Sequence, residues 1–78
     1  MAATVLFSAD QYTYRMLWDE DRQRYRGVCS EFPGLRYEAT STGDALAGIQ
    51  NRVAEEIASL ARQKKPAPEP LAVRRFGR

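Results

Sequence analysis

Large apolar side chains recur at every second position between residues 12 and 18, and this period of two predicts a β-strand. One side of the strand would carry four of them: Tyr12, Tyr14, Met16 and Trp18. Aromatic residues favour extended backbone, which supports the strand. Residues 19–24 are polar throughout, as is typical of a hairpin loop. We expect the apolar side of this strand to face the core.

Two further strands are predicted, over residues 25–30 and 35–40. Gly27 inside the first of them indicates a bulge or a close neighbour above it. In the second strand apolar and polar residues alternate, with Leu35, Tyr37 and Ala39 on one side and Arg36, Glu38 and Thr40 on the other. These patterns fit an antiparallel meander that is covered on one side.

The two strands are joined by the sequence Glu-Phe-Pro-Gly at residues 31–34, which predicts a tight turn. Pro33 fixes φ as the second position of a type II turn requires, and Gly34 can adopt the positive φ of the third. Phe32 precedes a proline and is therefore restricted to extended backbone. We expect Phe32, Pro33 and Gly34 to form a structural turn. On this hypothesis Gly34→Val impairs folding more than Glu31→Ala, because valine resists positive φ.

From residue 41 to residue 65 the apolar positions recur every three or four residues, which predicts an amphipathic helix. Ser41 is a suitable N-cap, and Asp44 follows it at the spacing of a capping box. Pro66 is expected to stop the helix. The apolar face is expected to carry five large residues with three alanines beside them: Leu46, Ile49, Val53, Ile57 and Leu60, with Ala45, Ala54 and Ala61.

Residues 66–78 begin with alternating prolines, which predict a stiff connector. Residues 71–76 then predict an edge strand, and if it pairs parallel to the first strand the helix is a right-handed crossover. Residues 1–11 show no clear period and are expected to form either a flexible lead or a short strand that pairs with another segment. Together the elements predict an α+β fold in one domain of residues 1–78. It is a small antiparallel sheet with one helix packed on one face, in the order β-β-β-α-β.

With 78 residues the chain can form one small domain with a thin core, so we expect it to gain stability as a homo-oligomer. One cysteine and no histidine exclude an internal disulfide and a Cys/His metal site. We expect Cys29 to be a buried apolar residue, and we expect no cofactor. The sequence has no transmembrane run and no secretory signal, so a cytoplasmic protein without membrane binding is expected.

The net charge of +2 is unevenly spread along the chain. Six basic residues and one acidic residue lie within residues 62–78, which leaves residues 1–61 mildly acidic. Such a basic stretch suits an RNA backbone or an acidic protein face, although it is also typical of a solvated tail. The candidate nucleic-acid contacts are Arg62, Lys64, Lys65, Arg74 and Arg75.

Residues that could carry catalysis are few. No histidine is available as a general base, and the serines have no partner base at a suggestive spacing. A two-metal nuclease would need Glu38 to meet Asp10 and Asp44 from distant positions. We therefore expect no catalytic residues, no bound metal and no enzymatic activity.

Several short motifs occur in a recognisable order: Tyr-Thr-Tyr-Arg-Met-Leu-Trp at 12–18, Tyr-Arg-Gly at 25–27, Glu-Phe-Pro-Gly-Leu at 31–35, Asp-Ala-Leu at 44–46, Glu-Pro-Leu at 69–71 and Arg-Arg-Phe at 74–76. In this order they resemble the HicB antitoxin family over about residues 12–77. The resemblance implies a partial RNase H fold that lacks the catalytic carboxylates.

Membership of that family implies a non-enzymatic inhibitor in a type II toxin-antitoxin system, which covers a HicA-type toxin that cuts mRNA. The candidate partner contacts are Glu20, Tyr25, Glu31 and Glu38. Many family members continue into a DNA-binding segment, whereas this sequence ends at Arg78, so DNA binding is not expected of these residues. The alternative is a stand-alone RNA-binding or protein-interaction module that uses the basic C-terminal stretch.

Overall fold

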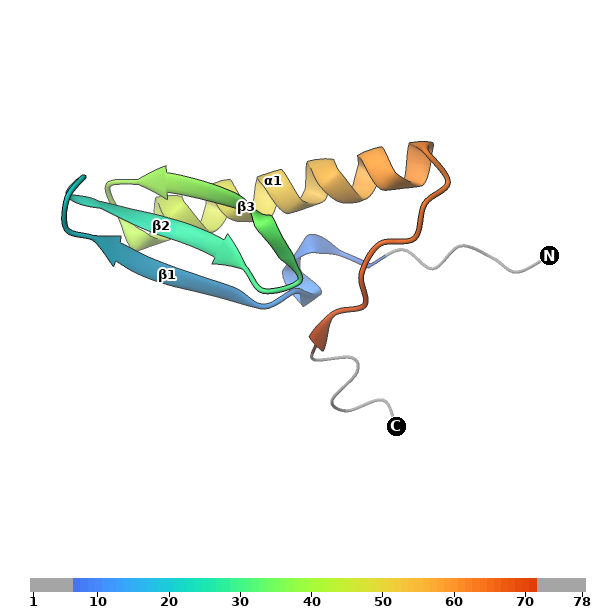
Figure 1. Cartoon of the computed structure of the whole chain (residues 1–78), viewed down its shortest axis with the longest axis horizontal. Coiled ribbons are helices and arrows are strands. Elements are labelled where there is room, and N and C mark those ends of the chain that lie inside the picture. Colours follow the sequence, from blue (N-terminus) through green and yellow to red (C-terminus); the bar gives the residue numbers. More distant parts are fainter. Residues whose placement is uncertain (1–6, 72–78) are drawn as a thin grey trace.

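A computed structural model of the chain describes residues 7–71 (Figure 1). A three-stranded antiparallel sheet in the order β1-β2-β3 is covered on one face by a single long helix. The elements are a 3-10 helix η1 (Ala9–Gln11), strands β1 (Tyr14–Asp19), β2 (Arg24–Cys29) and β3 (Phe32–Ala39), and helix α1 (Thr42–Arg62). The predicted α+β class and the order β-β-β-α are therefore confirmed. The predicted strand at residues 71–76 lies, from residue 72 on, outside the described residues, as do residues 1–6 of the lead.

The β1–β2 hairpin closes where its polar loop was predicted. Asp19 pairs with Arg24 across the hairpin, and residues 20–23 form the turn. The Asp19 Oδ1 atom accepts hydrogen bonds from the backbone N–H groups of Asp21 and Arg22, at 3.1 and 3.2 Å. Gln23 supplies the positive φ, 56°, that the loop needs in the absence of a glycine. Local side-chain bonds of this kind are what make aspartate a frequent turn residue.

The turn predicted at Phe32, Pro33 and Gly34 is wrong. These residues belong to β3, and Gly34 does not adopt a positive φ. The chain reverses instead at Ser30-Glu31, before Phe32, because Cys29 pairs directly with Phe32. The next pair is Val28 with Arg36, so residues 33–35 lie outside the ladder as an irregularity in the strand. Pro33 is tolerated there because an edge strand needs no N–H at that position.

The helix packs against the sheet at Gly27 in the central strand. A Cβ atom at this position would lie 2.7 Å from the backbone oxygen of Ala45 and 2.9 Å from Cγ2 of Ile49. Of the two structures that this glycine predicted, the close neighbour is therefore the one present. Because Gly27 faces α1, the β2 residues Arg26 and Val28 must point to the opposite, open face of the sheet.

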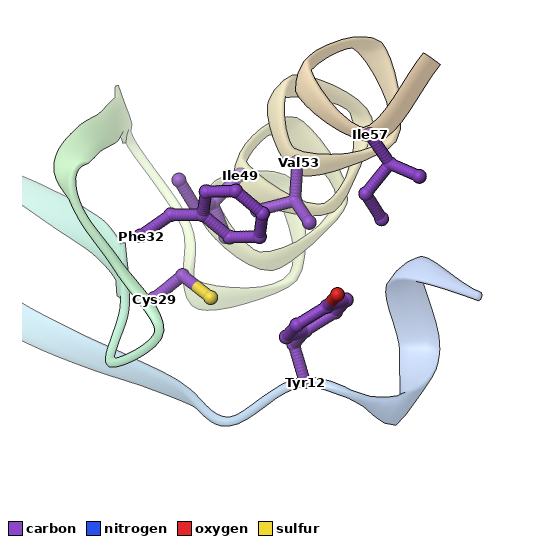
Figure 2. Packing of buried hydrophobic residues seen from close by; sticks show 6 residues of the cluster. All are labelled: Tyr12, Cys29, Phe32, Ile49, Val53 and Ile57. Atoms are coloured by element: carbon purple, nitrogen blue, oxygen red, sulfur yellow. The ribbon is translucent and has the colours of Figure 1, made fainter. Parts of the chain in front are cut away.

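The core lies between the sheet and α1, toward the end of the sheet where β2 turns into β3 (Figure 2). It consists of six buried residues: Tyr12, Cys29, Phe32, Ile49, Val53 and Ile57. The rings of Tyr12 and Phe32 meet edge to face with centroids 5.3 Å apart. Phe7 and Ala9 pack against this cluster, so two residues of the predicted flexible lead are held against the core. Each fully buried aliphatic or aromatic side chain contributes about 1.5–3 kcal/mol.

The helix begins as predicted, with the Ser41 hydroxyl accepting from the Asp44 N–H at 3.1 Å. It ends at Arg62 rather than at Lys65, because Lys64 adopts a left-handed φ of 58°. The N–H of Lys64 then bonds to Ala61 O and that of Lys65 to Leu60 O, which is the Schellman arrangement. The chain thus reverses before Pro66 is reached.

Four residues predicted to be in the apolar interior are exposed: Trp18, Leu46, Ala54 and Ala61. The reason is the position of α1, which packs mainly on β3 and β2 and only slightly on β1. Trp18 lies at the hairpin end of β1, the strand that α1 contacts least, and is 47% exposed. The buried stripe of the helix is correspondingly narrow, consisting of Ala45, Ile49, Val53 and Ile57.

The proline-rich connector folds back across the end of the domain (Figure 1). Pro70 is buried, and the Tyr12 hydroxyl donates to the backbone oxygen of Pro68 at 2.7 Å. The connector has no regular secondary structure between residues 65 and 70. It is therefore held by side chains of the domain rather than by a ladder of its own.

Replacing Gly27 by alanine is expected to lower the free energy of unfolding by about 1–3 kcal/mol, the usual effect of overpacking. The added methyl group would meet the backbone of α1, which cannot move without displacing Ile49. Gly34→Ala is the matched control, since a Cβ there meets nothing within 4 Å and the backbone φ is not positive. Urea denaturation of the two variants measures the difference; equal midpoints would contradict the close packing.

Candidate functional site

An aromatic pair marks the hairpin end of the sheet, with Trp18 exposed and Tyr25 half-buried. Trp18 and Tyr25 pair across β1 and β2, with ring centroids 4.9 Å apart at an angle of 61°. The Trp18 Nε1–H donates to Glu20 Oε1 at 2.7 Å, and the Gln23 amide donates to the backbone oxygen of Glu20 at 2.8 Å. We call Trp18, Glu20 and Tyr25 the hairpin-tip cluster. It presents an oriented aromatic surface next to a fixed negative charge.

Two of the four predicted partner contacts, Glu20 and Tyr25, therefore lie together, and Trp18 connects them. Glu38 lies apart from them, because its register with Arg26 places it on the open face of the sheet. Its carboxylate forms ion pairs with Arg22 at 3.2 Å and with Arg26 at 3.5 Å. The charge of Glu38 is thus already matched within the domain.

An open pocket with a volume of about 490 Å³ lies at the β3 edge of the sheet beside Glu38. We call it the arginine pocket, and its lining is Arg22, Arg26, Arg36, Tyr37, Glu38 and Arg52. Arg26 also bonds to Asp19 at 2.6 Å, which fixes its guanidinium group. The pocket is therefore strongly basic, although residues 1–61 as a whole are mildly acidic.

Glu31, the fourth predicted contact, lies at the other end of β2, about 20 Å from the hairpin tip at the usual rise of a strand. Its carboxylate accepts from the N–H and the hydroxyl of Thr13, both at 3.0 Å, and from the Leu71 N–H at 2.8 Å. The Cys29 thiol points to it at 3.4 Å. Glu31 thus joins the start of β1, the β2–β3 turn and the connector.

Burial and hydrogen bonds shift the pKa values of the titratable groups around Glu31. Burial raises the pKa of Cys29 and the pKa values of Tyr12 and Tyr14, so all three stay protonated near neutral pH. For Glu31, burial alone would raise the pKa, but the N–H groups of Leu71 and Thr13 outweigh it and lower the pKa. Cys29 therefore lacks the stabilised thiolate that a nucleophile requires.

The remaining predicted residues fall into two groups. Arg62, Lys64 and Lys65 are exposed at the C-terminal end of α1, whereas Arg74 and Arg75 lie outside the described residues. Within residues 7–71, no three His, Cys, Asp or Glu side chains are grouped so as to hold a metal ion. In the same part of the chain, no helix combines the length and apolar character needed to cross a bilayer.

Two features of the surface were missed in the sequence. The alternation of apolar residues correctly predicted that Trp18 lies on the helix side of β1. It did not indicate that the helix would leave Trp18 exposed. The arginine pocket had a weak signal, because Arg26 and Arg36 both occupy the polar positions of their strands. Arg22 and Arg52 join them from a loop and from the helix, which no spacing along the chain indicates.

The chain matches no protein-family model, no curated protein and no solved structure. The described residues define it as a small α+β domain, one antiparallel sheet with a single helix on one face. Its function has to be argued from the two surfaces described above and from the sequence resemblance.

Replacing Glu31 by alanine is expected to lower the free energy of unfolding by about 1.5–3 kcal/mol, since bonds to a charged acceptor are lost. Gly34→Val should cost less, because no positive φ and no neighbouring atom opposes the larger side chain. The structure thus reverses the order expected from the sequence. Thermal unfolding of the two variants tests it, and a larger loss for Gly34→Val would restore the turn hypothesis.

The lowered pKa of Glu31 also makes stability depend on pH. The stabilisation is fully present above the unfolded-state pKa of glutamate, about 4.3, and is lost as the pH falls through the lower folded-state value. Between pH 6 and pH 3 the melting temperature of the wild type should therefore fall more than that of Glu31→Gln. If the melting temperatures of the wild type and of Glu31→Gln fall by the same amount across this range, Glu31 is not the group responsible.

Proposed function

We propose that this chain is a HicB-like antitoxin, a non-enzymatic protein that binds and covers a HicA-type, mRNA-cleaving toxin. The observation that carries the proposal is the hairpin-tip cluster, in which an exposed tryptophan and a half-buried tyrosine stand beside a fixed carboxylate. Aromatic residues of this kind are the usual anchors of protein interfaces. The β-β-β-α order is compatible with the partial RNase H fold that the sequence resemblance implies.

Charge indicates which surface would meet the toxin. A toxin that binds RNA is expected to be basic, so the arginine pocket would repel it. The hairpin tip carries Glu20 and Asp21, and the exposed side of α1 carries Glu55. In this proposal Glu20 and Tyr25 are contacts, Trp18 is the central anchor, and Glu31 and Glu38 support the domain from within. Such charges mainly increase the rate of association.

Self-association is part of the proposal. Within the described residues β1 has a partner only on its β2 side, so its other edge is available to pair with further backbone. The alternative function, a stand-alone RNA-binding or protein-interaction module, would use the exposed Arg62, Lys64 and Lys65. Replacing Arg62, Lys64 and Lys65 by glutamine separates the two, because it removes the exposed basic charges and leaves both the hairpin tip and the connector in place.

The test is to express the chain together with the small basic protein encoded by the adjacent reading frame, in a catalytically inactive form, and to measure binding by calorimetry. Trp18→Ala is expected to weaken binding about 30-fold or more, the usual effect of losing a central anchor. Leu17→Ala is the matched control: it also removes an exposed apolar side chain, but from the open face of the sheet.

Glu20→Lys should slow association with little effect on the melting temperature, since Glu20 is exposed. The active toxin provides a second readout, because co-expression of the wild-type chain should restore growth and co-expression of Trp18→Ala should not. An adjacent protein that neither binds nor impairs growth would contradict the antitoxin proposal.

A further inference from the structure

The arginine pocket carries more positive charge than the domain itself balances. Four of its lining residues are arginines and one, Glu38, is acidic. Glu38 is shared between Arg22 and Arg26, while Arg36 and Arg52 have no ion pair within residues 7–71. The Nε atom of Arg26 is buried, and although it lies 3.5 Å from Glu38 it has no hydrogen-bond acceptor. The donors available to an anion are therefore mainly those of Arg36 and Arg52, because the Arg26 Nε is buried.

Guanidinium groups suit one class of anion in particular. They present paired N–H donors in a planar fork that matches the oxygen atoms of phosphate or carboxylate groups. The ladder places Arg15 opposite Val28 and Val28 opposite Arg36, so Arg15 stands in the same row, two strands or about 10 Å away. Positive charge therefore continues from the pocket across the open face, as a ligand with repeated anionic groups would require.

An aromatic ring beside the pocket favours a nucleic acid over an acidic protein. Tyr37 lines the pocket and is 42% exposed. Its ring lies directly against the backbone of α1 at Gly48, where a Cβ atom would overlap it. The helix thus fixes the ring while leaving much of it open to solvent. A rigid, exposed aromatic ring next to basic side chains is the usual platform for stacking an unpaired base.

We propose that the arginine pocket binds single-stranded nucleic acid, with backbone phosphates on Arg36, Arg52 and Arg22 and one base stacked on Tyr37. The open shape of the pocket suits a strand that passes through it rather than an enclosed free nucleotide. This site lies at the β3 edge, whereas the hairpin-tip anchor Trp18 lies on β1, at the other edge of the sheet. It is also distinct from the basic stretch that begins at Arg62, and it does not depend on the antitoxin proposal.

The test is fluorescence anisotropy with a fluorescein-labelled, unstructured 12-nucleotide RNA, titrated with the full chain at several salt concentrations. Arg36→Ala/Arg52→Ala should weaken binding about tenfold or more. It should also flatten the salt dependence by about 1.4 in the log–log slope, two phosphate contacts at roughly 0.7 each. Tyr37→Leu should weaken binding about tenfold with the slope unchanged, because stacking releases no counterions.

The matched control is Arg62→Ala/Lys64→Ala, which removes the same number of charges from the end of α1 and should leave affinity within twofold. Glu38→Gln should tighten binding, because among the described residues it removes the only carboxylate from the pocket lining. Circular dichroism checks that every variant is folded; only folded variants are compared, and the gain expected for Glu38→Gln cannot result from unfolding.

Three outcomes would overturn the proposal: no binding by the wild type at 50 mM salt, a loss for the control pair as large as for Arg36→Ala/Arg52→Ala, or a Tyr37→Leu variant that binds like the wild type. Competition identifies the ligand. Adenosine monophosphate that competes as well as the 12-mer would show a free-nucleotide site, and poly-glutamate that does so would show a site for acidic protein. Either result contradicts binding of a nucleic-acid strand.

Discussion

The close contact between α1 and the central strand at Gly27 determines where the helix lies, and most of the surface follows from that position. With no side chain at Gly27, the backbone of α1 at Ala45 can settle directly over β2. A second glycine, Gly48, lets the ring of Tyr37 lie against the helix from β3. The helix is thus drawn to the β2–β3 half of the sheet, and β1 is left partly uncovered.

Because α1 leaves β1 partly uncovered, an apolar side chain of this strand is exposed on the surface. Trp18 was part of an apolar row whose other members pack against the core, yet its side chain is 47% exposed. It is stabilised instead by Tyr25 on the next strand and by the carboxylate of Glu20. A large exposed aromatic residue held in one orientation loses little side-chain entropy on binding a partner, which suits the docking role proposed for it.

The residue before β1 and the connector after α1 are joined to the β2–β3 turn by one acidic residue rather than by strand pairing. Glu31 accepts hydrogen bonds from Thr13 and from Leu71, groups that are 18 and 40 residues away in sequence. Tyr12 adds a bond to the connector at Pro68. In a domain with so thin a core, such charge-assisted bonds are a substantial part of the total stability. The corner that they form is structural, whereas the hairpin tip and the arginine pocket are open to partners.

The sequence alone determined the strands and the helix with its Ser41 cap, because periodicity and capping act locally. At Gly27 it indicated a bulge or a close neighbour, and the packing of α1 decided for the neighbour. It misplaced the turn at Pro33 and Gly34, since the pairing of Cys29 with Phe32 depends on burying Phe32 against the helix. Only the tertiary structure decided which strands α1 covers and which arginines meet beside Glu38. Those outcomes depend on packing between segments far apart in the chain, which no pattern within a single segment records.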